Sequence, residues 1–224
     1  MRIALIDNGV DRRLVDCEEE IDFSRRDMEQ SVRDEKYNHG TVCAGIIAKY
    51  APSSNIISLK AIETVGDRCS VQYIRKAILY CVENKIELIS MSVGTRDAVS
   101  IANLYNIISE ALKANILVVA SGSRNCKVYP AAFCGVVYVD INDAVNSRDM
   151  SSYIEDCPNG LKAYIASGTQ EVVFKNGERF VTPNYSSFAV PVIASILHNY
   201  MAEGYCSKDA INQLKIRSRC LQIN

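Results

Sequence analysis

The sequence predicts an α/β fold with a doubly wound, mostly parallel sheet, helices on both faces and a C-terminal β-hairpin. Strand-like apolar runs alternate with segments of helical periodicity through most of the 224 residues, which is the pattern of parallel βαβ units. An apolar content of 48% is ample for a packed core. No internal repeat, low-complexity tract or Pro/Gly/Ser-rich linker divides the sequence. We therefore expect a single domain over residues 1–224.

The individual elements follow from apolar runs and turn signals. Buried strands are expected where short apolar runs end in turn residues, over 2–6, 55–61, 86–91, 116–120 and 136–139. Helices are expected where apolar residues recur at helical spacing or small residues pack closely, over 39–49, 70–83, 99–113, 186–201 and 208–217. Asn176-Gly177 is a strong two-residue turn signal with apolar flanks, so residues 172–181 are expected to form the hairpin.

Charge and hydropathy exclude several functional classes. The chain has 25 Lys plus Arg and 26 Asp plus Glu, a net charge of −1, which gives no basic surplus for nucleic acid or an anionic membrane surface. No apolar run approaches the roughly 18 residues of a membrane span. The N-terminal run enters a strand directly, without the pattern of a signal peptide. We expect a cytoplasmic protein with neither a nucleic acid nor a membrane partner, and the oligomeric state stays open.

The chain contains nine cysteines, an odd number, and no pair has the C-x-x-C spacing of a zinc knuckle or redox site. Several lie within apolar runs, as small buried thiols do. Without an export signal, free thiols in a reducing compartment are the favoured interpretation, and a disulfide framework is the alternative. The nine are Cys17, Cys43, Cys69, Cys81, Cys126, Cys134, Cys157, Cys206 and Cys220.

Three short motifs place chemically useful residues in a fixed order. Asp7 stands at the carboxyl end of the first expected strand, where ligands gather in open parallel sheets. His39 opens a segment rich in glycine and alanine, and Ser187 precedes an apolar helix. Taken singly, Asp7 is best read as a turn residue, His39 as a cap or surface residue, and Ser187 as an N-cap. Together they carry more information, because His39 follows Asp7 by 32 residues in the order Asp, His, Ser.

With these motifs the sequence resembles the subtilisin-like serine peptidases. The family's Asp, His and Ser motifs are resembled, in that order, by Ile-Asp-Asn-Gly-Val, His-Gly-Thr-Val-Cys-Ala-Gly and Ser-Phe-Ala-Val-Pro. Two further family segments match residues 89–94 and 129–131. The resemblance implies that Ser187 is the nucleophile, His39 its general base and Asp7 the residue that orients the imidazole. It also implies that an extended peptide pairs with residues 92–94 and about 118–122. The substrate-binding residues would be Ser92, Val93, Gly94, Ser121 and Gly122.

The sequence departs from the family pattern at several positions. Tyr185 stands where the family usually has glycine, two residues before the nucleophile. Alignment places Ser123 at the oxyanion asparagine and Asn125 two residues later; we favour Asn125, because an amide donor suits the task. The family makes calcium conceivable as a cofactor, but we identify no ligand cluster, and Asp140 and Asp143 are interpreted as loop carboxylates. Cys43 matches a cysteine that makes some members sensitive to mercurials.

Two functional classes follow from the resemblance. The first, which we favour, is an intracellular serine endopeptidase that cleaves a peptide or protein substrate. We expect no prodomain ahead of the Asp motif, and in this the sequence resembles compact members that trim precursor peptides, so removal of a leader peptide is one specific hypothesis. The alternative is a catalytically weak or inactive relative that binds peptides for regulation. The intact triad favours the first class, and Tyr185 with the displaced asparagine keeps the second open.

Overall fold

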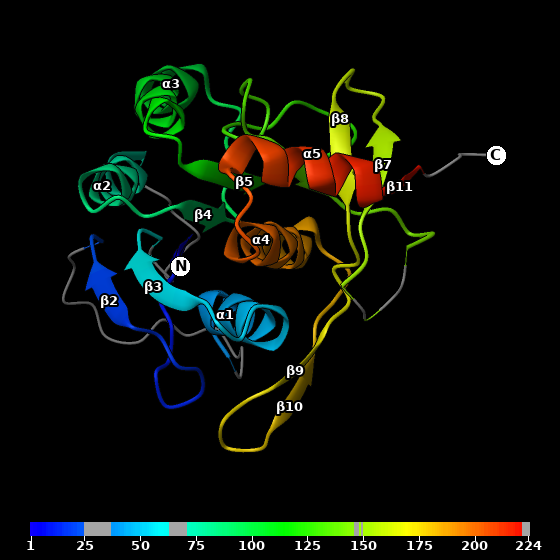
Figure 1. Cartoon of the computed structure of the whole chain (residues 1–224). Coiled ribbons are helices and arrows are strands. Elements are labelled where there is room, and N and C mark those ends of the chain that lie inside the picture. Colours follow the sequence, from blue (N-terminus) through cyan, green and yellow to red (C-terminus); the bar gives the residue numbers. More distant parts are fainter. Residues whose placement is uncertain (25–36, 63–70, 146–147, 149, 221–224) are drawn as a thin grey trace.

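A nine-stranded sheet organises the computed structural model, which describes residues 1–24, 37–62, 71–145, 148 and 150–220 (Figure 1). The strand order is β11-β7-β8-β6-β5-β4-β1-β3-β2, and neighbours are parallel except for the antiparallel pair β7 and β8. The strands are β1 (Arg2–Asp7), β2 (Glu19–Asp22), β3 (Asn55–Lys60), β4 (Leu88–Met91), β5 (Leu117–Ser121), β6 (Val137–Asp140), β7 (Tyr153–Asp156), β8 (Lys162–Ile165) and β11 (Arg219–Cys220).

Helices cover both faces of this sheet (Figure 1). The alternation within β1 shows the division: Ile3 and Leu5 join the core formed with α1 and α4, whereas Ala4 and Ile6 join the core formed with α2 and α3. The predicted doubly wound fold is therefore confirmed. The helices are α1 (His39–Tyr50), α2 (Val71–Glu83), α3 (Ala98–Lys113), α4 (Ser186–Ala202) and α5 (Ser207–Arg217).

The predicted C-terminal hairpin is present as β9 (Glu171–Val173) and β10 (Arg179–Val181). Its turn is longer than predicted, because the Phe174 N–H donates to the Glu178 carbonyl at 2.9 Å and encloses three residues. Gly177 has a φ of +81°, the left-handed conformation that three-residue hairpin loops require. The expectation of a two-residue turn at Asn176-Gly177 is therefore wrong, although the glycine serves the turn.

Two further expectations concern the state of the cysteines and the presence of a membrane-spanning segment. Seven cysteines within the described ranges are free thiols, and Cys69 and the side chain of Cys220 lie outside what the structure describes. Among the described helices, none combines the length and apolar character that a bilayer crossing requires.

Candidate active site

The carboxyl end of β1 and the first turn of α1 meet closely, and this contact brings Asp7 to His39. The Asn8 side-chain oxygen accepts a hydrogen bond from the Gly40 N–H at 2.8 Å. A Cβ atom at Gly40 would lie only 2.3 Å from the Gly9 carbonyl oxygen, so only glycine permits this approach. Asn38 caps α1 by accepting from the Thr41 N–H at 2.9 Å. The turn after β1 and the helix start are therefore held as one unit.

Asp7 and His39 form a hydrogen-bonded pair. The His39 Nδ1 atom lies 3.0 and 2.9 Å from the two carboxylate oxygens of Asp7, which is 2% exposed. Burial by itself disfavours a charged imidazole, but the Asp7 carboxylate outweighs it, so the pKa of His39 lies above its ordinary value. A carboxylate only accepts hydrogen bonds, so Nδ1 carries the proton and Nε2 is left as the basic nitrogen of the neutral ring.

Cys43 lies one helical turn after His39 and contacts its ring. The thiol sulfur is 3.6 Å from Nδ1 and 3.9 Å from Nε2, and it also approaches the Ser187 carbonyl oxygen at 3.8 Å. Cys43 is fully buried, and this burial raises the pKa of its thiol, which is therefore neutral at ordinary pH. Cys43 thus joins the imidazole to the backbone of the predicted nucleophile.

Ser187 lies inside the first turn of α4, and the residue at the N-cap position is Tyr185, which provides no side-chain cap. The interpretation of Ser187 as an N-cap is therefore wrong, and first-turn N–H groups lack an intrahelical partner. Ser92 Oγ donates to the Ser187 carbonyl at 2.8 Å, and the Phe188 ring stacks on His39 at 4.8 Å. Within the described residues the Ser187 hydroxyl makes no hydrogen bond, and therefore none to His39.

The predicted substrate-binding residues lie at the carboxyl ends of two neighbouring strands. Residues 92–94 follow β4, and Ser121 ends the adjacent β5. A cavity of about 200 Å³ adjoins the first segment and is lined by Val93, Gly94, Thr95, Tyr129 and Pro130, with Val71, Ile74, Ser100 and Leu104. Its lining mixes apolar side chains such as Val93 and Leu104 with polar groups such as those of Thr95 and Ser100, so a side chain that enters it would meet both kinds of surface.

The loop after β5 distinguishes the two oxyanion candidates. The Ser123 N–H donates to the Tyr138 hydroxyl at 2.8 Å, and the Ser123 hydroxyl accepts from the Cys126 thiol at 3.6 Å. Asn125 is exposed, and its amide has no hydrogen-bond partner within the described residues. The Ser123 N–H is therefore already bound, whereas the Ser123 hydroxyl keeps a hydrogen to donate and the Asn125 amide is free to turn.

Tyr185 occupies the position of the expected glycine without filling the site. Its backbone lies so close to Gly168 that a Cβ atom there would sit 2.3 Å from the Tyr185 carbonyl oxygen. The side chain is 61% exposed and its ring stacks on Phe188 with centroids 6.5 Å apart. The glycine that this close approach needs is thus supplied by the opposite segment, and the tyrosine ring extends the aromatic surface that begins at His39.

Comparison with known proteins identifies the family. The model of the subtilase family, Peptidase_S8, matches residues 1–204. The chain belongs to the subtilase family. It is 26% identical over 219 residues to an intracellular serine protease of Paenibacillus polymyxa, covering 88% of this chain and 65% of that relative. The major intracellular serine protease of Bacillus subtilis (strain 168) is 24% identical over 237 residues, covering 93% and 71%.

A solved structure supports the same fold. The epidermin leader peptide processing serine protease of Staphylococcus aureus superposes with a TM-score of 0.68 at 15% identity, covering 96% of this chain and 69% of that one. The chain spans 65% of the length of the Paenibacillus relative, less than two thirds. The likeness in structure extends over nearly the whole of this chain.

Potential metal ligands gather at one place in the described part of this subtilase. Asp7, His39 and Cys43 offer ligand atoms within 4.8 Å of one another. Calcium requires six or more oxygen ligands, so this set does not fit the calcium that the family resemblance suggested. Asp140 is not the loop carboxylate that was expected, because it ends β6 and is 4% exposed.

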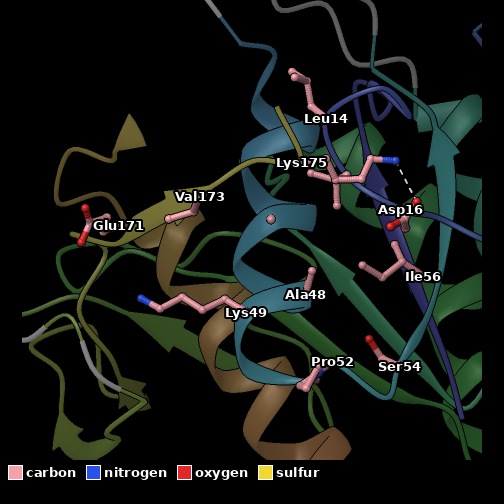
Figure 2. Close-up of a pocket in the computed structure, with 13 residues that line it drawn as sticks. Leu14, Asp16, Ala48, Lys49, Pro52, Ser54, Ile56, Glu171, Val173 and Lys175 are labelled. Atoms are coloured by element: carbon pink, nitrogen blue, oxygen red, sulfur yellow. Dashed lines mark hydrogen bonds and ion pairs between the residues drawn. The ribbon is translucent and has the colours of Figure 1, made fainter. Parts of the chain in front are cut away.

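A larger cavity of about 500 Å³ lies away from the predicted triad (Figure 2). It borders the second half of α1, and Lys49, which lines it, follows His39 by ten residues, about 15 Å along the helix. Its charged groups already have partners, since Lys175 pairs with Asp16 at 2.8 Å and Arg179 with Glu171 at 3.3 Å. None of the predicted site residues lines it, so it does not contribute to the chemistry derived from the motifs.

Mercuric ion is expected to inactivate the subtilase through Cys43. A metal bound to the buried thiol would enter the space between Cys43 and the His39 ring, which are 3.6 Å apart. Displacing the imidazole by about 1 Å lowers the rate by about 10²-fold. Residual peptide cleavage after titration with mercuric chloride measures this, and Cys43→Ala should resist. Cys81→Ala, at another fully buried thiol, is the matched control; inhibition unchanged in Cys43→Ala would assign the effect to another cysteine.

Proposed function

We propose that this subtilase is an intracellular serine endopeptidase that acts on peptide or protein substrates. The observation that carries the proposal is the pair of the buried Asp7 and the partly exposed His39, which packs through Cys43 and Phe188 against the turn that bears Ser187. His39 Nε2 accepts the Ser187 hydroxyl proton while Ser187 Oγ bonds to the substrate carbonyl carbon. The proton then passes to the leaving amine as the C–N bond breaks, and water hydrolyses the acyl-enzyme.

Negative charge develops on the substrate carbonyl oxygen during this attack, and fixed donors must stabilise it. The uncapped N-terminus of α4 supplies the Ser187 N–H together with the positive end of the helix dipole. The second donor comes from the loop after Gly122. Asn125 fits this role, because its amide has no described partner and is a longer donor than the Ser123 hydroxyl, which contacts the Cys126 thiol at 3.6 Å.

Asn125→Ala is therefore expected to lower kcat by about 10²–10³-fold while KM stays nearly unchanged. Steady-state kinetics on one peptide substrate measure both constants. Ser123→Ala is the matched comparison on the same loop, and its loss should be smaller, since the Ser123 hydroxyl contacts Cys126 at 3.6 Å. The reverse ranking would assign the donor to Ser123. Wild-type kinetics in both variants would assign the stabilisation to backbone groups alone.

The proposed substrate lies extended between the ends of β4 and β5. Backbone pairing with residues 92–94 would supply affinity, and the cavity beside Val93 and Gly94 would select one side chain. Pairing with residues 118–122 is not open to a substrate, because β5 already pairs with β4 and β6 and the Gly122 N–H donates to the Val139 carbonyl. Ser92, whose hydroxyl holds the Ser187 carbonyl at 2.8 Å, would join the substrate strand to the nucleophile turn.

The biological substrate that we propose is a precursor peptide from which a leader is removed in the cytoplasm. The relatives named as intracellular proteases and the fold shared with a leader peptide processing protease support this proposal. Candidate precursor peptides incubated with the enzyme should be cut at one site, which mass spectrometry locates. Parallel incubation with Ser187→Ala should leave each precursor intact. General degradation of unfolded proteins without a preferred site would contradict this substrate assignment.

The second candidate function is peptide binding with little or no catalysis. It is favoured by one observation, the lack of a hydrogen bond from the Ser187 hydroxyl to His39 within the described residues. Such bonds are often long in free enzymes and shorten in the substrate complex, so the peptidase proposal keeps precedence. A fluorophosphonate probe separates the two functions, since it reacts only with an activated serine.

A further inference from the structure

The loop that follows β5 is held by a single buried hydroxyl group. Tyr138, on β6, accepts a hydrogen bond from the Ser123 N–H at 2.8 Å and donates one to the Ser123 carbonyl at 2.7 Å. The side chain therefore binds both polar backbone groups of one residue. Tyr138 is 4% exposed, so these bonds form away from bulk water. A hydroxyl with one donor and two acceptor positions can satisfy this arrangement completely.

Asn159, in the segment between β7 and β8, completes the arrangement. Its side-chain amide donates to the Ser123 carbonyl at 2.8 Å, to the Tyr138 hydroxyl at 3.0 Å and to the Cys126 carbonyl at 3.2 Å. Its oxygen is itself fixed, since it accepts from the Leu161 N–H at 2.9 Å. Tyr138 and Asn159 together hold the backbone at both ends of residues 123–126, and we call this pair the loop clamp.

Gly122 allows the loop clamp to form. A Cβ atom at this position would lie 2.2 Å from the Tyr138 ring, so the ring and the loop backbone are in direct contact. On its other side the loop is tied to the residue before the predicted nucleophile: Ser121 Oγ and Ser186 Oγ are 2.8 Å apart, and Ser186 Oγ donates to the Gly122 carbonyl at 3.4 Å. The loop therefore lies between the clamp and the start of α4.

We propose that Tyr138 and Asn159 are positioning residues that set the distance between the oxyanion donor of loop 123–126 and Ser187. This inference rests on the proposed peptidase function. A donor stabilises the developing charge only if it is already in place when the charge forms, and an error of about 1 Å costs about 10²-fold in rate. Because the clamp occupies the Ser123 N–H, this backbone group is not available as the donor, and the candidates on the loop are the side chains of Asn125 and Ser123.

Tyr138→Phe tests the proposal because it removes the hydroxyl and keeps the ring against Gly122. We expect kcat for a fluorogenic peptide to fall about tenfold or more with KM nearly unchanged, since the loss concerns the transition state. The rate of fluorophosphonate labelling should fall in parallel. Tyr50→Phe is the matched control: its hydroxyl makes bonds of 2.6 Å to the Arg148 carbonyl and the Gln170 side chain. It should lower the melting temperature comparably and leave kcat unchanged.

Asn159→Ala provides a second variant, since it removes the amide donors while Tyr138 stays in place. It should show the same fall in kcat with a nearly constant KM. Wild-type kcat in folded Tyr138→Phe and Asn159→Ala would overturn the inference and leave the clamp a purely structural feature. A rise in KM with constant kcat would also overturn it, because it would show a role in substrate binding. A wild-type protein that neither cleaves peptides nor reacts with the probe would instead refute the proposed function.

Discussion

Replacing Ser187 with alanine is expected to abolish fluorophosphonate labelling and to lower kcat for peptide cleavage by about 10⁶-fold. The probe bonds only to a serine whose proton a neighbouring base accepts, and the His39 ring packs against Phe188, the residue after Ser187. Mass spectrometry of the intact protein detects the adduct, and peptide mapping should locate it at Ser187. His39→Ala is expected to abolish labelling as well, because it removes the base that accepts the serine proton. The second histidine, His198, is fully buried and cannot replace it.

Ser186→Ala is the matched control for this experiment. Its hydroxyl lies 2.8 Å from Ser121 Oγ and is not the group that the motif assigns to attack. This variant should still be labelled at Ser187, but at a lower rate, because the Ser186 hydroxyl joins the loop after β5 to the start of α4. Labelling that persists in Ser187→Ala but disappears in Ser186→Ala would show that Ser186, and not Ser187, is the nucleophile. A wild-type protein that binds peptides tightly yet never reacts would favour the regulatory alternative.

The strands at the centre of the sheet were predictable, and those towards its edges were not. β1, β4, β5 and β6 are buried on both faces, so each is a continuous apolar run in the sequence. β2 has the sequence Glu-Glu-Ile-Asp and stands at the sheet edge with mostly exposed residues. This strand forms because β3 offers it backbone hydrogen-bond partners. Pairing with a distant strand leaves no apolar pattern in the sequence of β2 itself. β7, β8 and β11 were also missed, because β7 and β8 mix buried with exposed residues and β11 has only two residues, so none of them is a continuous apolar run.

The candidate site divides in a similar way. Motif order pointed to Asp7 and His39, and the structure places them in hydrogen-bond contact. The residues that hold the site together were not predictable: Asn8 binds Gly40 across 32 residues, and Asn159 binds Ser123 across 36. Contacts between a side chain and a distant backbone depend on how the strand ends are arranged. A sequence pattern reports residue types, and it does not report that arrangement.

Asp7→Asn is expected to lower kcat by about 10⁴-fold at neutral pH, the second largest effect among these variants. The carboxylate accepts the His39 Nδ1 proton at 2.9 Å, and an amide at this position no longer fixes the tautomer or stabilises the imidazolium formed during attack. Asp97→Asn is the matched control, because Asp97 caps the exposed start of α3 by accepting from the Ser100 N–H. Asparagine caps a helix as well as aspartate does, so kcat should stay at the wild-type value.

The pH profile gives Asp7→Asn a second and independent signature. Only neutral His39 accepts a proton, so wild-type kcat/KM should rise with pH through the pKa of the free enzyme. The midpoint should lie above the ordinary histidine value, since Asp7 raises the pKa of His39 against the effect of burial. Without the carboxylate the burial remains, and the midpoint should move to lower pH. Profiles measured from acid to alkaline pH at low substrate concentration test this shift. An unchanged midpoint in Asp7→Asn would mean that another group controls the titration, and that Asp7 does not orient the base.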